Sequence, residues 1–99
     1  MRFSFKSRKL LLLYEEEKGA SQYDSGALDA FFEVMAVIDS APDERTLYQL
    51  KSLHFEKLKG KRKHERSLRL NKQWRLIVEL LKDDDGSYLQ INEISDHYE

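Results

Sequence analysis

The chain of 99 residues contains no cysteine, one proline and four glycines, which stand apart from one another. The absence of cysteine excludes a disulfide framework and catalysis by a thiolate. It also fits a reducing compartment. Isolated glycines exclude the Gly-rich loops that bind nucleotide phosphates or dinucleotides.

Long apolar runs are absent as well. No compact run is longer than Leu10–Tyr14, which has five residues, whereas a membrane-spanning helix needs roughly 20. The first residues are basic but lead into no apolar segment with a small-residue cleavage site, so we expect no signal peptide. With 40% hydrophobic residues, residues 1–99 are expected to form one small soluble domain in the cytoplasm, without membrane contact.

Charge is distributed unevenly along the chain, although the formal net charge is only −1. Residues 51–75 contain ten Lys and Arg and two Glu, a local net charge of +8, and the remainder carries −9. A local field of that size attracts polyanions whatever the charge of the whole protein. The alternative interpretation of the same run is a solvated charged face that binds nothing.

The amino-terminal segment predicts a strand followed by a helix. Arg2–Phe5 alternates between polar and apolar residues, which favours a short strand. Ser7–Lys18 predicts a helix with Ser7 as its N-cap and Gly19 as its stop. Basic residues at the start of this segment and acidic residues at its end oppose the helix dipole, so packing must outweigh that cost.

A second helix is indicated more strongly by its apolar spacing and extends to about Ser40. Its apolar face consists of Leu28, Phe31, Phe32, Met35 and Ile38. Pro42 interrupts it, and the acidic pair that follows opens a short helix from Asp43 to Leu50.

Period-two alternation replaces the helical pattern after Gly60. Arg66–Leu70 and Trp74–Leu81 predict two strands joined by a short turn, and Ser87–Ser95 predicts a returning strand. The order of strand, helices and antiparallel sheet predicts an α+β domain with the helices packed on one side.

The turn before the last strand decides which residue faces Arg75. Asp83–Gly86 has hairpin chemistry, because an Asp-Gly pair tolerates the positive φ of tight turns. If the last two of these residues form the turn, Arg75 lies opposite Asp96. A four-residue loop instead places Ile94 opposite Arg75.

The three histidines, His54, His64 and His97, lack the close pairwise spacing typical of metal sites. We therefore expect no metal and no other cofactor. His54 and His64 are interpreted as surface residues.

What remains is a basic loop followed by two basic strands and a polar terminus. Four motifs occur in order: Leu58-Lys59-Gly60-Lys61-Arg62, Ser67-Leu68-Arg69-Leu70-Asn71, Trp74-Arg75 and Asp96-His97-Tyr98. With them the chain resembles the HigB branch of the RelE-like toxins of bacterial type II toxin–antitoxin systems, most closely over residues 53–98. The resemblance implies a RelE-like fold, with an amino-terminal strand and two or three helices packed on an antiparallel β-sheet.

The resemblance also implies a function. Such a toxin is an mRNA interferase, a ribosome-dependent endoribonuclease that stops translation and uses metal-free attack of the ribose 2′-OH on the phosphate. A cognate antitoxin, expected to be a helix-turn-helix protein, neutralises it, and operator DNA is contacted only through that antitoxin. Two alternatives stay open: a non-nuclease toxin of the same fold, as in ParE-like gyrase inhibitors, and a degenerate toxin retained as an antitoxin-binding protein.

Metal-free RNA cleavage needs a base for the 2′-OH, cations for the phosphate and an acid for the departing 5′ oxygen. Arg69 and Arg75 offer forked donors for phosphate oxygens. His97 is the candidate acid or base, since histidine titrates near neutral pH. Asp96 can orient a protonated His or an Arg, and Tyr98 can stack on a base or donate a proton.

The cations expected to hold the RNA backbone are Lys57, Lys59, Lys61, Arg62, Lys63 and Arg66. The chain departs from the family at two places. Relatives commonly end Asp-Tyr-His, so the last two residues of that motif are transposed here. Many relatives carry a His where this chain has Glu56, and His54 is therefore given no catalytic role.

Overall fold

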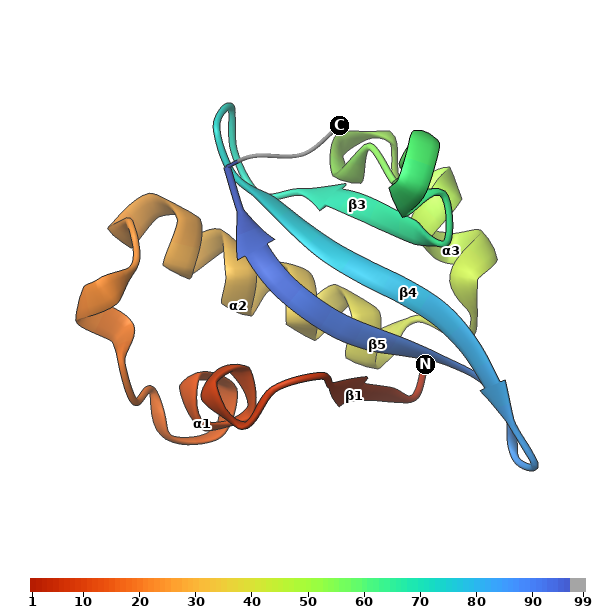
Figure 1. The fold of residues 1–99 in the computed structure, drawn as a ribbon, viewed down its shortest axis with the longest axis horizontal. Helices are drawn as coiled ribbons and strands as arrows, with labels where there is room; N and C mark the ends of the chain where they lie inside the picture. Colours follow the sequence, from red (N-terminus) through yellow and green to blue (C-terminus); the bar gives the residue numbers. More distant parts are fainter. Residues whose placement is uncertain (97–99) are drawn as a thin grey trace.

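The computed structural model describes residues 1–96, which form a five-stranded sheet with helix α2 lying across one face (Figure 1). The strands are β1 (Phe3–Phe5), β2 (Glu56–Lys57), β3 (Glu65–Arg69), β4 (Arg75–Asp83) and β5 (Gly86–Ser95). The helices are α1 (Arg8–Glu16), α2 (Ser25–Ser40) and α3 (Glu44–Gln49), and the 3-10 turns are η1 (Ala20–Gln22), η2 (Lys51–Leu53) and η3 (Gly60–Arg62). The α+β fold predicted from the sequence is confirmed.

The strand order is β1-β5-β4-β3-β2, so the first strand of the chain lies beside the last one. β1 runs parallel to β5, and the other neighbouring strands are antiparallel. The predicted strands are all present, with ends shifted by one or two residues. β2 was not predicted, because two residues are too few to show an alternating pattern.

Helix α1 begins where the sequence predicts and ends earlier. The side chain of Ser7 caps it by accepting a hydrogen bond from the backbone N–H of Leu10. The helix stops short of Lys18 because Glu17 adopts a left-handed conformation, with φ of 54°, and its N–H bonds to carbonyls of the last turn. Burial of Leu10 and Leu13 outweighs the unfavourable order of charges along the helix.

The hydrophobic core lies between α2 and the sheet. Three residues of the predicted apolar face of α2, Phe31, Met35 and Ile38, are fully buried. Leu76 and Val78 of β4 face them as members of the same core cluster. Because side chains alternate along a strand, Ile77, which lies between them, faces the other side of the sheet. It is fully buried there, although its partners on the neighbouring strands, Ser67 and Glu93, are polar.

The turn between β4 and β5 differs from both sequence predictions. Asp83 pairs with Gly86, so the turn lies one residue earlier than the Asp-Gly pair predicts. A β-bulge then shifts the register by one residue, since Val78 pairs with Ile91 but Ile77 pairs with Glu93. As a result, Arg75 faces neither Asp96 nor Ile94; it pairs with Ser95.

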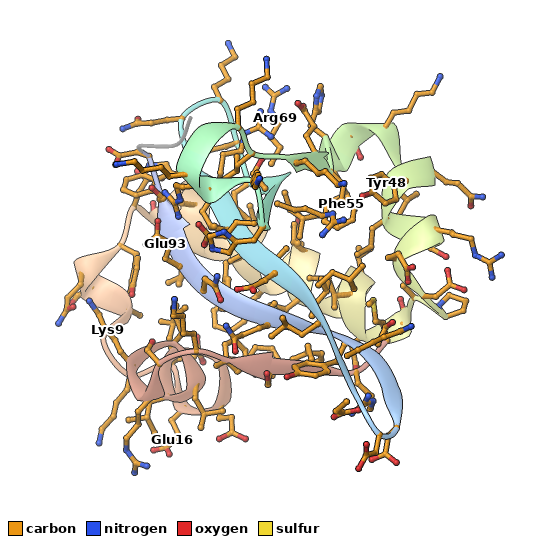
Figure 2. All side chains as sticks on the ribbon, turned by 45° about the vertical axis from the view of Figure 1, so that its right-hand side comes forward. Lys9, Glu16, Tyr48, Phe55, Arg69 and Glu93 are labelled. Atoms are coloured by element: carbon orange, nitrogen blue, oxygen red, sulfur yellow. The ribbon has the colours of Figure 1, made fainter. Side chains whose placement is uncertain are left out.

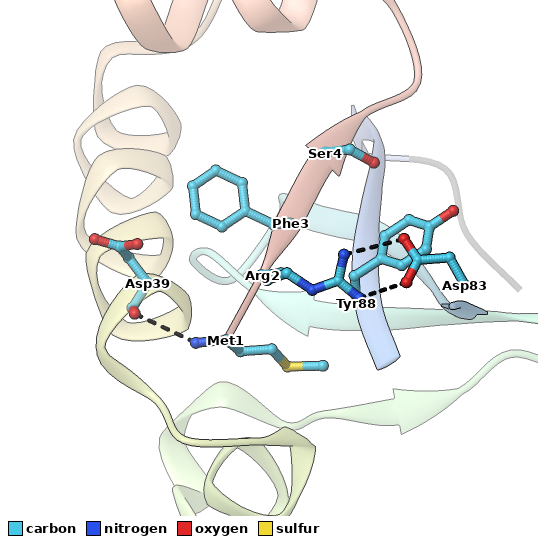
Figure 3. A pocket seen from close by; sticks show the side chains of 7 residues that line it. All are labelled: Met1, Arg2, Phe3, Ser4, Asp39, Asp83 and Tyr88. Atoms are coloured by element: carbon cyan, nitrogen blue, oxygen red, sulfur yellow. Dashed lines mark hydrogen bonds and ion pairs between the residues drawn. The ribbon is translucent and has the colours of Figure 1, made fainter. Parts of the chain in front are cut away.

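A hollow lined by β1, β4 and β5 lies at the far end of the sheet from Arg75 (Figure 3). Arg2 donates hydrogen bonds to both carboxylate oxygens of Asp83, at 3.0 and 2.7 Å, and to the carbonyl of Gly86. The hydrogen bonds from Arg2 hold the pKa of Asp83 below its usual range. These contacts tie the amino-terminal strand to the β4–β5 hairpin.

Candidate functional site

Two arginines and a serine form a row across three strands of the sheet. Arg69 of β3 pairs with Arg75 of β4, which pairs in turn with Ser95 of β5. Directly paired residues share a face, and this is the face opposite Leu68 and Leu76 of the core. Within residues 1–96 we find no hydrogen bond or ion pair of the Arg69 guanidinium.

Two like charges directly opposite each other on neighbouring strands are destabilising unless an anion lies between them. Both Arg69 and Arg75 are half-buried, so screening by water is incomplete. Each guanidinium presents a planar fork of N–H donors that matches two oxygens of a phosphate. The arginine row is therefore a candidate phosphate site.

The turn between β3 and β4 fixes the pairing of these arginines. The side-chain oxygen of Asn71 accepts hydrogen bonds from the backbone N–H groups of Gln73 and Trp74, at 3.0 and 2.8 Å. The N–H groups of Leu70 and Asn71 both donate to the carbonyl of Trp74. Since a slip of one residue moves every side chain to the other face, this turn decides that both arginines lie on the same face.

A histidine and a glutamate beside the arginine row were not predicted as site residues. The Nη1 of Arg75 donates to the backbone carbonyl of His54 at 3.4 Å. The Nδ1 of His54 lies 3.9 Å from a carboxylate oxygen of Glu56, and both side chains are well exposed. Glu56 pairs with Ser67, two residues from Arg69 on the same face. The pair thus brings acid–base groups to the phosphate site.

The sequence contains one signal for this pair. The family resemblance leads to the expectation of a His at the position of Glu56, but no strand pattern places this residue beside Arg69. His54 has a positive φ of 46°, an unusual conformation for a residue other than glycine. Such backbone strain is often found at functional sites.

The basic loop between β2 and β3 is fixed to the sheet by Arg62. Its Nε donates to Glu65 at 2.6 Å, and its Nη2 donates to Glu93 at 3.2 Å. Glu65 is only 6% exposed and also accepts a hydrogen bond from the side chain of Asn92 at 2.9 Å. The hydrogen bond from Arg62 lowers the pKa of Glu65, although burial acts in the opposite direction. Arg62 therefore has a structural role, and its contact with RNA stays a prediction from the sequence.

The bulge in β5 makes this arrangement possible. Asn92 accepts a hydrogen bond from Gln90 and donates one to Glu65, while Glu93 contacts Arg62. In a regular strand, consecutive residues such as Asn92 and Glu93 face opposite sides of the sheet. The extra residue lets both reach the face of the sheet that carries Arg69.

The other predicted cations separate into two groups. Lys59, Lys61 and Lys63 are exposed in the loop around η3. Arg66 pairs with Lys57, and its Nε donates to the hydroxyl of Tyr48, so these two side chains lie on the face opposite Arg69. Figure 2 shows Arg69 well separated from Tyr48.

The terminal cluster lies at the carboxyl end of β5. Asp96 is half-buried and directly follows Ser95, the partner of Arg75. His97 and Tyr98 lie outside the described residues. Their catalytic roles stay predictions from the sequence.

Neither a metal cluster nor a membrane helix is found in the part of the chain that the structure describes. Within residues 1–96, no three His, Asp or Glu side chains gather where they could hold a metal ion. No helix there is long and apolar enough to cross a membrane.

Glu65→Gln is expected to lower the free energy of unfolding at neutral pH by about 1.5–3 kcal/mol, because it removes a charge-assisted hydrogen bond from a buried carboxylate. The loss is measured by urea denaturation. Glu93→Gln is the matched control, because its carboxylate contacts the same arginine but is 48% exposed. The control should change stability by less than about 1 kcal/mol.

The effect of Glu65→Gln should also depend on pH. Since the pKa of Glu65 is lower in the folded chain than its usual 4.5, the carboxylate stabilises the fold fully above pH 4.5. Its contribution is lost as the pH falls through the folded pKa. The stability difference between wild type and variant should therefore shrink in acid. If the difference in free energy of unfolding between wild type and Glu65→Gln is constant from pH 7 to pH 3, the charge of Glu65 does not stabilise the fold.

Comparison with protein families identifies one match over most of the chain. Residues 3–93 match the family model of HigB-like toxins, described as the RelE-like toxin of the type II toxin–antitoxin system HigB. The toxin HigB-1 of Vibrio cholerae is 34% identical over 79 residues, which cover 80% of this chain and 83% of that protein.

Solved structures with a similar fold include other toxins. A YoeB/ParE toxin from Agrobacterium tumefaciens superposes with a TM-score of 0.60 at 15% identity, over 99% of this chain and 100% of that one. The YoeB–YefM complex from Staphylococcus aureus gives a TM-score of 0.59 at 22% identity, over 99% and 98% of the two chains. At these identities the likeness establishes the fold.

Proposed function

The chain belongs to the HigB-like toxins, RelE-like toxins of type II toxin–antitoxin systems, and from this we propose that it is a ribosome-dependent mRNA endoribonuclease neutralised by a cognate antitoxin. The observation that carries the proposal is the direct pairing of Arg69 with Arg75 on one face of the sheet. A pair of opposed guanidinium forks suits the pentacoordinate phosphate of RNA cleavage, whose negative charge is larger than that of the substrate.

In the proposed reaction, the ribose 2′ oxygen attacks the adjacent phosphorus. A bond from the 2′ oxygen to phosphorus forms as the bond from phosphorus to the 5′ oxygen breaks. The products are a 2′,3′-cyclic phosphate and a 5′-hydroxyl. A base takes the proton of the 2′-OH, and an acid gives a proton to the departing 5′ oxygen. Dependence on the 2′-OH restricts the reaction to RNA.

Two sets of side chains are available for these proton transfers. In the described part of the chain, the backbone of His54 contacts Arg75, and Glu56, which lies near the His54 side chain, is on the same face as Arg69. Asp96 follows the strand position opposite Arg75, and the family resemblance adds His97 and Tyr98. We assign Arg69 and Arg75 to the phosphate and the proton transfers to these flanking groups. The exposed cations Lys59, Lys61 and Lys63 are assigned to the RNA backbone.

The dependence on the ribosome is tested by comparing two substrates. Purified protein should cleave an mRNA that is being translated in a reconstituted system at least about 10²-fold faster than the same RNA free in solution. The ribosome would hold the scissile phosphate in a reactive geometry that a flexible single strand rarely adopts. Equal rates on the two substrates would identify a nuclease that does not need the ribosome and would contradict the proposal.

A further inference from the structure

Two exposed apolar side chains lie at the end of α3. Tyr48 and Leu50 are 47% and 40% exposed and are the large hydrophobic residues most open to solvent within residues 1–96. The ring of Tyr48 packs against Phe55 with centroids 4.6 Å apart, and its hydroxyl accepts a hydrogen bond from the Nε of Arg66 at 2.9 Å. Tyr48 is therefore held in place from two sides while almost half of it remains accessible (Figure 2).

Three basic residues lie close to this apolar pair, on the same face of the sheet or next to it in the sequence. Lys51 and Lys57 are exposed, and Lys57 pairs with Arg66 across β2 and β3. Paired side chains share a face, so Lys57 and Arg66 lie on the face of the sheet that carries Tyr48. The one acidic residue of β2, Glu56, faces the other side by alternation. We name the set Tyr48, Leu50, Lys51, Lys57 and Arg66 the α3–β2 surface.

The surface adjoins a free strand edge. Among the strands of residues 1–96, β2 is the last in the order of the sheet and pairs with β3 alone. The backbone N–H of Leu58 donates a hydrogen bond to the carbonyl of Glu65, so Leu58 directs its backbone groups toward β3. Every second residue of a strand does the same, so Glu56 also directs its backbone groups toward β3. In an antiparallel ladder the intervening residue directs its backbone groups outward. Lys57 therefore offers an N–H and a carbonyl to an added strand.

We propose that the α3–β2 surface binds an extended acidic segment of a partner protein. The segment adds to the free edge of β2, places an apolar side chain against Tyr48 and Leu50, and sets carboxylates beside the three cations. Tyrosine and arginine are the residue types that most often dominate binding energy at protein interfaces. In a toxin of this family the partner is the antitoxin, and this assignment rests on the proposed function.

The composition of the surface favours a protein over RNA. Leu50 offers a nucleic acid neither a charge nor a stacking face, and the ring of Tyr48 already packs against Phe55. The composition of the α3–β2 surface also favours an acidic partner over a second copy of this chain. Two β2 edges in contact would bring Lys57 of each copy close together, and lysine on an edge strand opposes such pairing.

The proposal is tested by measuring the affinity of the purified full chain for its cognate antitoxin. Leu50→Asp and Lys57→Glu each place a carboxylate on the surface without disturbing the core, and each should weaken the complex about 10- to 100-fold. Lys61→Glu is the control, since it makes the same charge change in the exposed loop around η3. The control should keep the wild-type affinity, and thermal melting should show all three variants folded.

A backbone test separates strand addition from simple charge attraction. Lys57→Pro removes the charge and the outward backbone N–H but leaves every hydrogen bond to β3 in place. Lys57→Ala removes only the charge. If a strand adds to this edge, the proline variant should bind the antitoxin at least about 5-fold more weakly than the alanine variant. Equal affinities of the two variants would contradict strand addition.

Cleavage of translated mRNA is measured on the two surface variants, Leu50→Asp and Lys57→Glu, and not on Lys61→Glu, because Lys61 is assigned to the RNA backbone. Weaker antitoxin binding with wild-type cleavage supports the proposal. Wild-type antitoxin affinity with reduced cleavage would show that the surface binds RNA and would overturn it. If even the wild-type chain cleaves no mRNA, the proposed nuclease function fails, while the affinities still decide whether this surface binds the antitoxin.

Discussion

Replacement of Arg75 by alanine is expected to lower the rate of mRNA cleavage by about 10²–10³-fold and to relieve growth arrest in cells that express the variant. Arg75 lies between Arg69 and Ser95 in the row across the sheet. Its guanidinium can donate two parallel hydrogen bonds to phosphate oxygens as their charge grows. Arg75→Lys should recover only part of the activity, because an ammonium group keeps the charge but lacks the fork.

Arg75→Ala must be compared with a substitution that removes a positive charge near the arginine row but not within it. Lys72→Ala, in the exposed turn between β3 and β4, serves that purpose and should keep nearly full activity. Thermal melting and antitoxin binding should show that Arg75→Ala is folded. A folded Arg75→Ala variant with wild-type cleavage rates would show that Arg75 is a structural residue, engaged only with its neighbours in the chain.

Removal of residues 96–99 is expected to lower the cleavage rate by about 10²–10⁴-fold, the range associated with loss of a general acid or base. The shortened chain should still fold, because within residues 1–96 the last buried core residue is Ile91 and the last partly buried residue packed against the core is Ile94. It should also still bind the antitoxin, because the α3–β2 surface is intact. Cleavage assays measure the loss of activity, and denaturation of the wild-type and the shortened chain measures whether stability is kept.

Single substitutions then assign the loss to particular groups. His97→Gln should account for most of it, and Tyr98→Phe for less, unless the transposed order of the two residues has moved proton transfer to the tyrosine. Glu56→Gln tests the other acid–base pair, His54 and Glu56, near the arginine row. Wild-type growth arrest by the chain that ends at Ser95 would remove the terminal cluster from the site, and the His54–Glu56 pair would then have to carry the proton transfers.

Much of the fold could be predicted from local patterns. The apolar spacing of Leu28, Phe31, Met35 and Ile38 predicts α2 because a helix must bury one face, and the structure buries that face against the sheet. Ser7 begins α1 as predicted, since an N-cap depends on residues within one turn. The position of β2 could not be predicted, because a two-residue strand exists only through its pairing with β3.

The site was predicted in part. The sequence places Arg69 and Arg75 on adjacent strands, and the structure pairs them directly. The residue opposite Arg75 depends on a bulge at Asn92, and a bulge arises from interactions across the sheet that leave no local pattern. Charge runs predict attraction to polyanions but not the face on which each cation lies. For this reason the contacts of Arg62, expected to bind RNA, with Glu65 and Glu93 could not be predicted.

Mapping of mRNA 5′ ends after induced expression tests the proposed nuclease activity most directly. The proposed reaction predicts new 5′-hydroxyl ends inside translated reading frames within minutes of induction of the wild-type chain. It predicts that these ends are absent after induction of Arg75→Ala to the same protein level. Growth arrest by the wild-type chain without new ends in mRNA would contradict the proposal and favour a toxin of the same fold with another target, such as DNA gyrase.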